Sequence, residues 1–398
     1  SRCSLLGQFF KKMESIISTL FKKETKTTAA VASRSKNATL IEESDTLQLV
    51  YDVFTYSAGS NKRNSDTCLI NFMFLHGSGM NRSVWEYYIA YMSKHFDNNT
   101  KWQINKMITL DQVTHGDSAE INRNLLGTNF DWADGARDAC KVAQEEFLPK
   151  RMSNCVNVIV GHSMGGFQAL SCGILSPTLF DLIIVIEPVV YVPHVENKLN
   201  VTIVPPRFYE ALWNKMEDKF KDMNDFKKFM KKRSFYKNAN AEIIERMIQF
   251  EAVHTAEGII RTKISQQQNI ICYLTLDPTA KWLIDSLPYI NTPVYGIVGG
   301  KSTWCPPQNQ ELLVAKIPKY QKDIIPDGDH LLNLEDPGEC LTKIFHCVNK
   351  FVDNFKMNMR KRTPNKDNDR YRLKLFEEQF ALFKNERVKD GPIKLAKL

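Results

Sequence analysis

The feature that most constrains the fold is a series of short apolar runs, rich in β-branched residues, each ending in a glycine, a proline or a polar residue. These runs cover residues 46–56, 68–75, 107–110, 156–160, 182–186, 294–298 and 323–325. Helical stretches lie between them, as over 132–147, where small apolar residues recur at helical spacing. Such alternation is typical of an α/β protein with a mostly parallel central sheet flanked by helices. Catalytic groups in such sheets gather at the carboxyl ends of the strands.

Composition narrows the class of protein. The net charge of +8 is mildly basic, but the positive residues form no long run with interleaved aromatics, which argues against a nucleic-acid partner. The densest basic stretch, 227–233, is expected to be one solvated helix face, with contact to an anionic surface as the alternative. No apolar run approaches the ~20 residues of a membrane span, so we expect no transmembrane segment. Nine cysteines without a CxxC pair or zinc pattern predict buried free thiols.

One segment breaks the alternation of strands and helices. Between residues 192 and 290 the chain is charged, helical in pattern, and rich in aromatic residues and methionine. Because this segment lies between two strands, we expect 192–290 to form a helical cap above the carboxyl edge of the sheet. Residues 41–191 and 291–350 then form the core. Most of the aromatic residues would fill the cap's own interior, and the others would line an apolar substrate pocket.

The two ends of the chain differ from the core in composition. We expect 1–40 to be a flexible N-terminal segment, with Met13 as the natural start. The tail 351–398 is basic and polar, but an amphipathic helix is predicted over about 369–387 from apolar residues at helical spacing: Leu373, Phe376, Phe380 and Phe383.

The last three residues, Ala396, Lys397 and Leu398, are a variant of the Ser-Lys-Leu peroxisomal address. They predict binding to a peroxisomal import receptor and a place in the peroxisomal matrix. The alternative is an ordinary basic C-terminus.

The strongest chemical motif is the segment 161–166, Gly-His-Ser-Met-Gly-Gly. It follows a strand and precedes a helix, which is the context of a nucleophile elbow. Small residues on either side allow the tight turn that lifts the Ser163 hydroxyl above the sheet edge. The helix that follows favours negative charge at this point. Ser163 is therefore the predicted nucleophile.

A serine nucleophile needs a base and an acid. His330 follows a late strand, and the order serine, acid, histidine fits this arrangement. The loop after the penultimate strand, where the acid commonly lies, contains no carboxylate over 298–305. We therefore favour Glu187, which ends the preceding strand, to orient His330. Asp327 and Asp329 are alternatives, although each is close to His330 in sequence.

An oxyanion intermediate needs two backbone N–H donors. One is expected from Met164, directly after the nucleophile, and the other from the loop at 76–79, with Ser78 favoured. The loop from Asp111 to Ser118 is interpreted as structural. The chemistry requires neither a metal nor another cofactor.

Together these motifs resemble the α/β-hydrolase superfamily over roughly residues 45–350. Within it, the chain is similar to yeast peroxisomal lipases at 74–80, 85–88, 161–170, 186–190 and 304–310, and in its terminal tripeptide. The resemblance implies a peroxisomal hydrolase of acyl esters, with fatty-acyl esters or lipids as substrates. It also implies that the missing acid after the penultimate strand is a feature of this subgroup.

Two other functions stay open. The basic cap could hold the phosphates of an acyl-CoA, which would make the chain a thioesterase. The missing usual acid also permits a non-catalytic binding protein with a hydrolase fold. The oligomeric state, including a homo-oligomer, is likewise open.

Overall fold

The structure is a computed structural model that describes residues 2–35, 40–57, 67–93, 101–148, 154–190, 206–275, 279–304, 307–361 and 369–388. The chain divides into two compact units, Ser1–Asn349 and Lys350–Leu398. The second unit contains the end of α13 (Pro337–Lys361) and helix α14 (Asp369–Val388), whose leucine and phenylalanine side chains are exposed. The candidate site lies wholly in the first unit.

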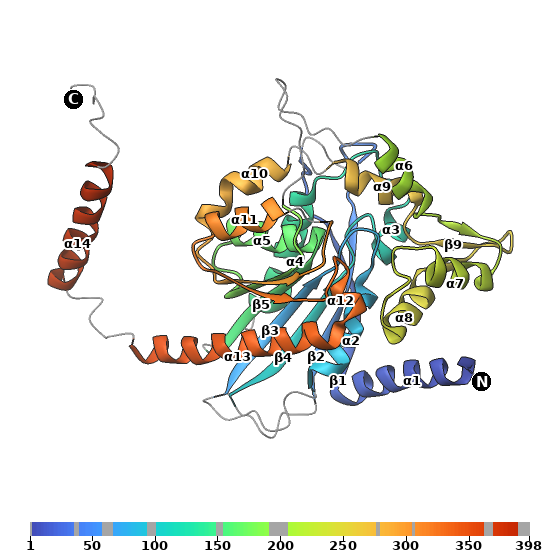
Figure 1. Ribbon diagram of the computed structural model, residues 1–398, viewed down its shortest axis with the longest axis horizontal. Coiled ribbons are helices and arrows are strands. Elements are labelled where there is room, and N and C mark those ends of the chain that lie inside the picture. The colour runs from blue at the N-terminus through green and yellow to red at the C-terminus, as the bar shows by residue number, and fades with distance from the viewer. Residues whose placement is uncertain are drawn as a thin grey trace. The chain divides into compact units, whose positions relative to one another are not determined.

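The first unit is built on an eight-stranded sheet in the order β1-β2-β4-β3-β5-β6-β10-β11 (Figure 1). β2 pairs antiparallel with both β1 and β4, and the other neighbours are parallel. This confirms the expected mostly parallel sheet. The strands are β1 (Phe21–Ala29), β2 (Gln48–Tyr56), β3 (Cys68–Leu75), β4 (Trp102–Leu110), β5 (Cys155–His162), β6 (Leu182–Ile186), β10 (Val294–Gly299) and β11 (Tyr320–Ile325).

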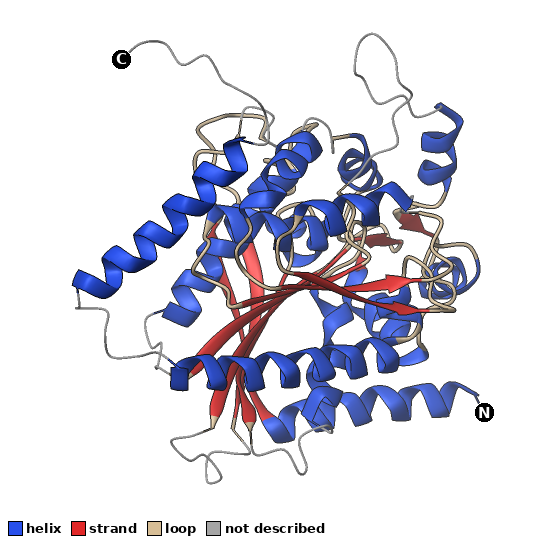
Figure 2. Ribbon diagram, turned by 60° about the vertical axis from the view of Figure 1, so that its left-hand side comes forward, coloured by secondary structure: helices blue, strands red, loops and turns tan. Residues whose placement is uncertain are grey.

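Helices cover both faces of this sheet (Figure 2). β3 is buried along its whole length, and its side chains point alternately to the two faces of the sheet. Met73 and Leu75 join the apolar core beneath α4 and α5, while Phe74 packs on Trp85 in front of α2. The core helices are α2 (Glu86–Met92), α3 (Gly116–Asn122), α4 (Trp132–Phe147), α5 (Met164–Leu175), α10 (Thr279–Ser286), α11 (Pro307–Lys316) and α12 (Leu332–Glu335).

The segment between β6 and β10 contains α6 (Pro206–Asn214), α7 (Met223–Lys232), α8 (Ala241–Glu251) and α9 (Gln266–Leu274). It also contains α10, which fell within the expected cap 192–290 but packs on the core through Ala280 and Leu283. The expected cap is mainly helical, and it also contains strands that the sequence did not predict. A three-stranded antiparallel sheet, in the order β7-β9-β8, joins these helices, with strands β7 (Lys219–Phe220), β8 (Ala252–His254) and β9 (Ile260–Thr262). Strands of two or three residues are too short to show the alternation that reveals a strand in sequence. Residues 191–205 lie outside the described part.

The N-terminal segment set aside as flexible is instead structured over residues 2–35. Helix α1 (Arg2–Leu20) leads into β1, which pairs with β2 along its whole length. Two lysines of β1 are matched by carboxylates of other elements: Lys26 contacts Glu146 at 2.9 Å and Lys23 contacts Glu86 at 3.4 Å. Ion pairs with other elements therefore allow this polar segment to form a strand, although its own sequence does not predict one.

Two further expectations concern the described residues. Seven cysteines are buried free thiols, as predicted: Cys68, Cys140, Cys155, Cys172, Cys272, Cys340 and Cys347. None of the helices that the structure describes has the length and apolarity that crossing a bilayer requires.

Candidate active site

Ser163 occupies a sharp turn between β5 and α5. Its backbone has φ 53° and ψ −114°, a positive φ that non-glycine residues rarely adopt. The turn requires small neighbours, because a Cβ on Gly161 would collide with the backbone of Gly165. The N–H of Ser163 donates to the carbonyl of Ile186 at 3.1 Å, which ties the turn to β6. Backbone strain of this kind clusters at functional sites.

His330 approaches Ser163 from the loop after β11. Its Nε2 lies 3.0 Å from the Ser163 Oγ, within hydrogen-bond distance. Beneath it, Nε2 of the buried His162 donates to the backbone carbonyl of His330 at 2.8 Å. Burial, and next the neighbouring His330, lowers the pKa of His162 to about 3, so its imidazole is neutral. His162 thus supports the loop that carries His330.

Glu187 reaches the other side of the same imidazole. Its Oε1 lies 3.4 Å from Nδ1 of His330, and its Oε2 accepts a hydrogen bond from the N–H of Gly299 at 3.0 Å. The side chain is only 1% exposed, and its backbone takes a positive φ of 46°. The structure therefore brings Ser163, His330 and Glu187 into one chain of contacts.

The two alternative carboxylates have other contacts. Asp327 is exposed and forms an ion pair with Lys301 at 2.9 Å. Oδ1 of Asp329 accepts a hydrogen bond from the backbone N–H of His330 at 2.7 Å. Neither carboxylate forms a hydrogen bond with the His330 ring among the described residues.

The two residues expected to supply the oxyanion donors, Ser78 and Met164, are in contact through their side chains. The hydroxyl of Ser78 contacts Sδ of Met164 at 3.5 Å, so these residues lie side by side next to the nucleophile. The neighbouring N–H of Gly79 is already used, because it donates to Nε2 of His115 at 2.9 Å. Burial, followed by the nearby His76, holds the pKa of His115 well below its usual value, so this ring remains a neutral acceptor. The N–H of Gly79 is therefore occupied, and Ser78 stays the expected oxyanion donor of this loop.

A buried arginine fixes this loop from below. Arg82 contacts Asp111, and it donates to Asp52 at 2.9 Å and to Asp117 at 2.8 Å. Burial alone would lower the pKa of Arg82, but the carboxylates of Asp111 and Asp52 raise it above its usual value. The loop from Asp111 to Ser118 thus anchors the segment that carries Ser78. Sequence reasoning missed Arg82 because its partners lie some 30 residues away along the chain.

A model of the "Alpha/beta hydrolase family" matches residues 72–342, which include Ser163, Glu187 and His330. The chain belongs to the α/β-hydrolase family. Its sequence is 41% identical to the peroxisomal membrane protein LPX1 of Saccharomyces cerevisiae over 343 residues, which cover 83% of this chain and 88% of that protein.

Solved structures agree with this assignment. The crystal structure of the peroxisomal α/β-hydrolase Lpx1 from Saccharomyces cerevisiae matches with a TM-score of 0.78 and 38% identity, covering 95% of this chain and 99% of that one. An esterase from M. tuberculosis matches with a TM-score of 0.56 at 14% identity, covering 86% of this chain and 98% of that one, and so shares the fold.

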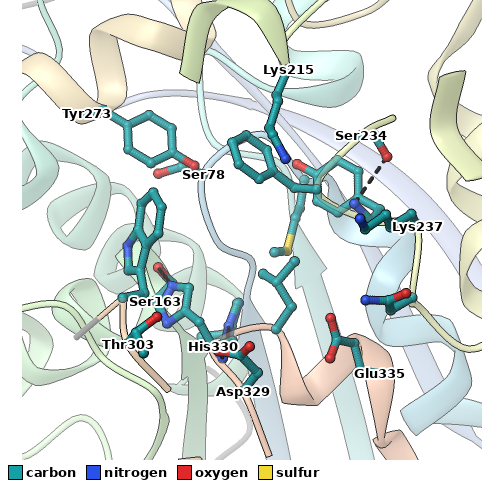
Figure 3. A pocket seen from close by; sticks show the side chains of 17 residues that line it. Ser78, Ser163, Lys215, Ser234, Lys237, Tyr273, Thr303, Asp329, His330 and Glu335 are labelled. Carbon is teal, nitrogen blue, oxygen red and sulfur yellow. Dashed lines mark hydrogen bonds between the residues drawn. The ribbon is translucent and has the colours of Figure 1, made fainter. Parts of the chain in front are cut away.

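In this α/β-hydrolase, Ser163 and His330 open into a cavity of about 280 Å³. Aromatic side chains form much of its wall, and two lysines and two carboxylates also line it (Figure 3). The aromatic residues are Phe235, Tyr236, Tyr273 and Trp304, and the charged ones are Lys215, Lys237, Asp329 and Glu335. Of these, sequence reasoning named Asp329 as an alternative acid, and it expected that some aromatic residues of the segment 192–290 line a pocket without saying which. The others lie in the cap, in the loop after β10 or in α12, and no local pattern separates them from residues that only pack.

Proposed function

We propose that this α/β-hydrolase is a serine hydrolase that cleaves carboxylic esters of fatty acids. The observation that carries the proposal is the 3.0 Å contact between Ser163 Oγ and His330 Nε2, with Glu187 behind the same imidazole. A serine hydroxyl is a weak nucleophile unless an adjacent base removes its proton. The strained turn and the buried carboxylate supply the fixed geometry that such a base requires.

The mechanism follows from these positions. Ser163 Oγ attacks the ester carbonyl while Nε2 of His330 takes the hydroxyl proton, and Glu187 stabilises the imidazolium that forms. The backbone N–H groups of Ser78 and Met164 hold the oxyanion of the tetrahedral intermediate. Collapse breaks the ester C–O bond, and His330 returns the proton to the departing alkoxide. A water molecule, activated by the same histidine, then releases the carboxylic acid from Ser163.

Other observations support the proposed fatty-acyl substrate and the proposed peroxisomal location. The aromatic wall of the cavity suits an apolar acyl chain. A relative at 41% identity is named a peroxisomal protein, and the chain ends in Ala396, Lys397 and Leu398. These three residues lie outside the described part of the structure. We place the protein in peroxisomes, in the matrix, imported by a receptor that reads the tripeptide.

The decisive experiment compares the wild type with Ser163→Ala. The purified proteins are given p-nitrophenyl esters from acetyl to palmitoyl and a fluorophosphonate probe. The wild type should hydrolyse the esters and label at Ser163, and the variant should do neither. Hydrolysis that survives in Ser163→Ala would reject the nucleophile. A folded wild type that does not label would favour the non-catalytic binding protein.

One observation favours acyl-CoA thioesters as a second candidate. Lys215 and Lys237 line the cavity from the cap, and neither pairs with a carboxylate among the described residues (Figure 3). Cations that share the cavity with the nucleophile and pair with no described carboxylate could bind the phosphates of coenzyme A. Replacing both with glutamine should then lower kcat/KM for palmitoyl-CoA about tenfold, the scale of two exposed charge contacts at up to ~1 kcal/mol each. Turnover of p-nitrophenyl palmitate should change little.

Lys228→Gln, on the basic face of α7 away from the cavity, is the matched control for charge. An equal loss for ester and thioester, or no loss for either, would remove the argument for the thioesterase.

A further inference from the structure

The loop between β10 and α11 contacts the catalytic centre through an aromatic ring. This is the loop in which the family commonly carries its acid, and here residues 300–304 contain no carboxylate. Instead the indole of Trp304 stacks on the imidazole of His330, with ring centroids 5.6 Å apart and planes 21° from parallel. Trp304 therefore contacts the face of the ring whose two nitrogens contact Ser163 and Glu187.

The stacking contact restrains tilting of the His330 imidazole, which the hydrogen bonds of the ring restrain only weakly. The contacts of His330 with Ser163 and Glu187, at 3.0 and 3.4 Å, involve the two ring nitrogens. Hydrogen bonds at ring nitrogens are directed in the plane of the imidazole, so they resist tilting of the ring about the line that joins them only weakly. A 3.4 Å contact is also longer than an ordinary hydrogen bond. An aromatic surface against the imidazole face opposes this tilt directly.

Trp304 is itself held by the cap. Its indole packs on Phe208 of α6 at 5.8 Å and on Tyr273 of α9 at 5.8 Å, with the second pair edge to face. Phe235, in the turn between α7 and α8, meets it at 6.4 Å, also edge to face. Three separate parts of the cap thus surround the ring that stacks on His330.

We propose that Trp304 is a positioning residue, which holds the imidazole of His330 in its reactive orientation and couples that orientation to the position of the cap. The inference rests on the proposed role of His330 as the base. The electron-rich indole face also attracts a cation, so it favours the imidazolium that forms while Ser163 attacks. Displacement of the cap aromatics would release Trp304 and slow the reaction without any change in Ser163, His330 or Glu187.

The test separates positioning of His330 from contact with substrate. Trp304→Leu should lower the fluorophosphonate labelling rate of Ser163 and kcat for p-nitrophenyl acetate about tenfold, the upper end of what one aromatic pair contributes. KM for this short ester should stay within about twofold, because acetate is too short to depend on an apolar wall. Trp304→Phe, which keeps a ring on the imidazole, should recover most of both rates. Trp213→Leu, a matched loss of a cap tryptophan, should leave them unchanged.

A different result would overturn the proposal. If Trp304→Leu raises KM for palmitoyl esters but leaves labelling and acetate kcat intact, Trp304 is only part of the substrate wall. If the leucine variant does not fold, Phe235→Leu replaces it. That change should lower labelling about threefold, in line with one lost aromatic pair, whereas Phe235→Tyr, which keeps a ring beside Trp304, should not. Wild-type labelling in a folded Phe235→Leu would refute the coupling.

A readout without turnover distinguishes failure of this inference from failure of the proposed function. The fluorescence of Trp304, taken as wild type minus Trp304→Phe, should be quenched when His330 is protonated on acidification. This quenching should vanish in His330→Gln. Quenching without Ser163 labelling would retain the stacking contact and reject the hydrolase. Labelling without quenching would retain the hydrolase and reject the positioning role.

Discussion

Replacing Glu187 with glutamine removes one charge from the proposed triad and almost no volume. The carboxylate lies 3.4 Å from Nδ1 of His330 and is 1% exposed. With an effective dielectric constant of ~20, a full charge on the imidazolium would interact with it by ~5 kcal/mol. Each ~1.4 kcal/mol of transition-state stabilisation is a factor of ten in rate. Allowing for the long contact and the remaining amide dipole, we expect kcat to fall about a thousandfold.

The assay is steady-state hydrolysis of p-nitrophenyl acetate at one pH, with the thermal midpoint measured alongside. The glutamine carbonyl can still accept the hydrogen bond from Gly299, so the fold should be retained. Asp327→Asn and Asp329→Asn are matched controls that remove a charge next to the same histidine, and both should keep kcat within about threefold. A folded Glu187→Gln with more than a tenth of wild-type kcat would refute the assignment of the acid.

Three further predictions concern the surroundings of the site. Arg82→Met leaves two buried carboxylates without their cation, so urea unfolding should show a loss of about 3–5 kcal/mol. Burial raises the pKa of Glu251 from 4.5 to about 7, so this carboxyl stabilises the fold fully below pH 4.5 and loses that contribution as the pH rises through 7. Between pH 4.5 and 8, Glu251→Gln should therefore gain about 3 kcal/mol in unfolding free energy relative to the wild type, and a constant difference would contradict this. Gly79→Ala combines a φ of +80° with a Cβ only 2.6 Å from the Tyr236 hydroxyl, whereas Gly258→Ala has a φ of +81° and open space. In both variants backbone strain should lower the free energy of unfolding by about 1–2 kcal/mol. In thermal unfolding Gly79→Ala should be the less stable of the two, and only Gly79→Ala should lower ester turnover.

The α/β class and most of the candidate site could be predicted because their signals are local. Ser163, Glu187 and His330 each lie at or just beyond the end of an apolar run, and parallel strands bring their carboxyl ends to one edge of the sheet. Three residues that are 24 and 143 positions apart in sequence (163, 187 and 330) could therefore be placed together without a structure. The glycines around Ser163 added the steric reason for the turn.

The parts that escaped prediction depend on contacts between distant segments. β1 contains four charged residues among nine, and both its backbone partner β2 and the carboxylates that contact Lys23 and Lys26 come from other segments. Arg82 follows a loop and carries no local mark of burial, since its three aspartate partners come from β2 and from the loop and helix after β4. Trp304 is a lone aromatic in a polar loop, and the rings it contacts come from distant segments of the chain. The periodicity of apolar residues and their secondary-structure propensity describe one segment at a time, so they do not reveal contacts between segments.

The position of the proposed acid and the role proposed for Trp304 have one structural cause. β6 and β10 are parallel neighbours, so Glu187 at the end of β6 can send Oε2 to the N–H of Gly299 and Oε1 to His330. Because the carboxylate comes from β6, the loop after β10 does not have to supply the acid that orients His330. The loop can then present a large apolar ring to the imidazole, which a charged side chain in the same place would not allow. An indole, unlike a carboxylate, can also pack against aromatic residues of the cap. Moving the acid by one strand thus makes room for a contact through which the cap can act on the base.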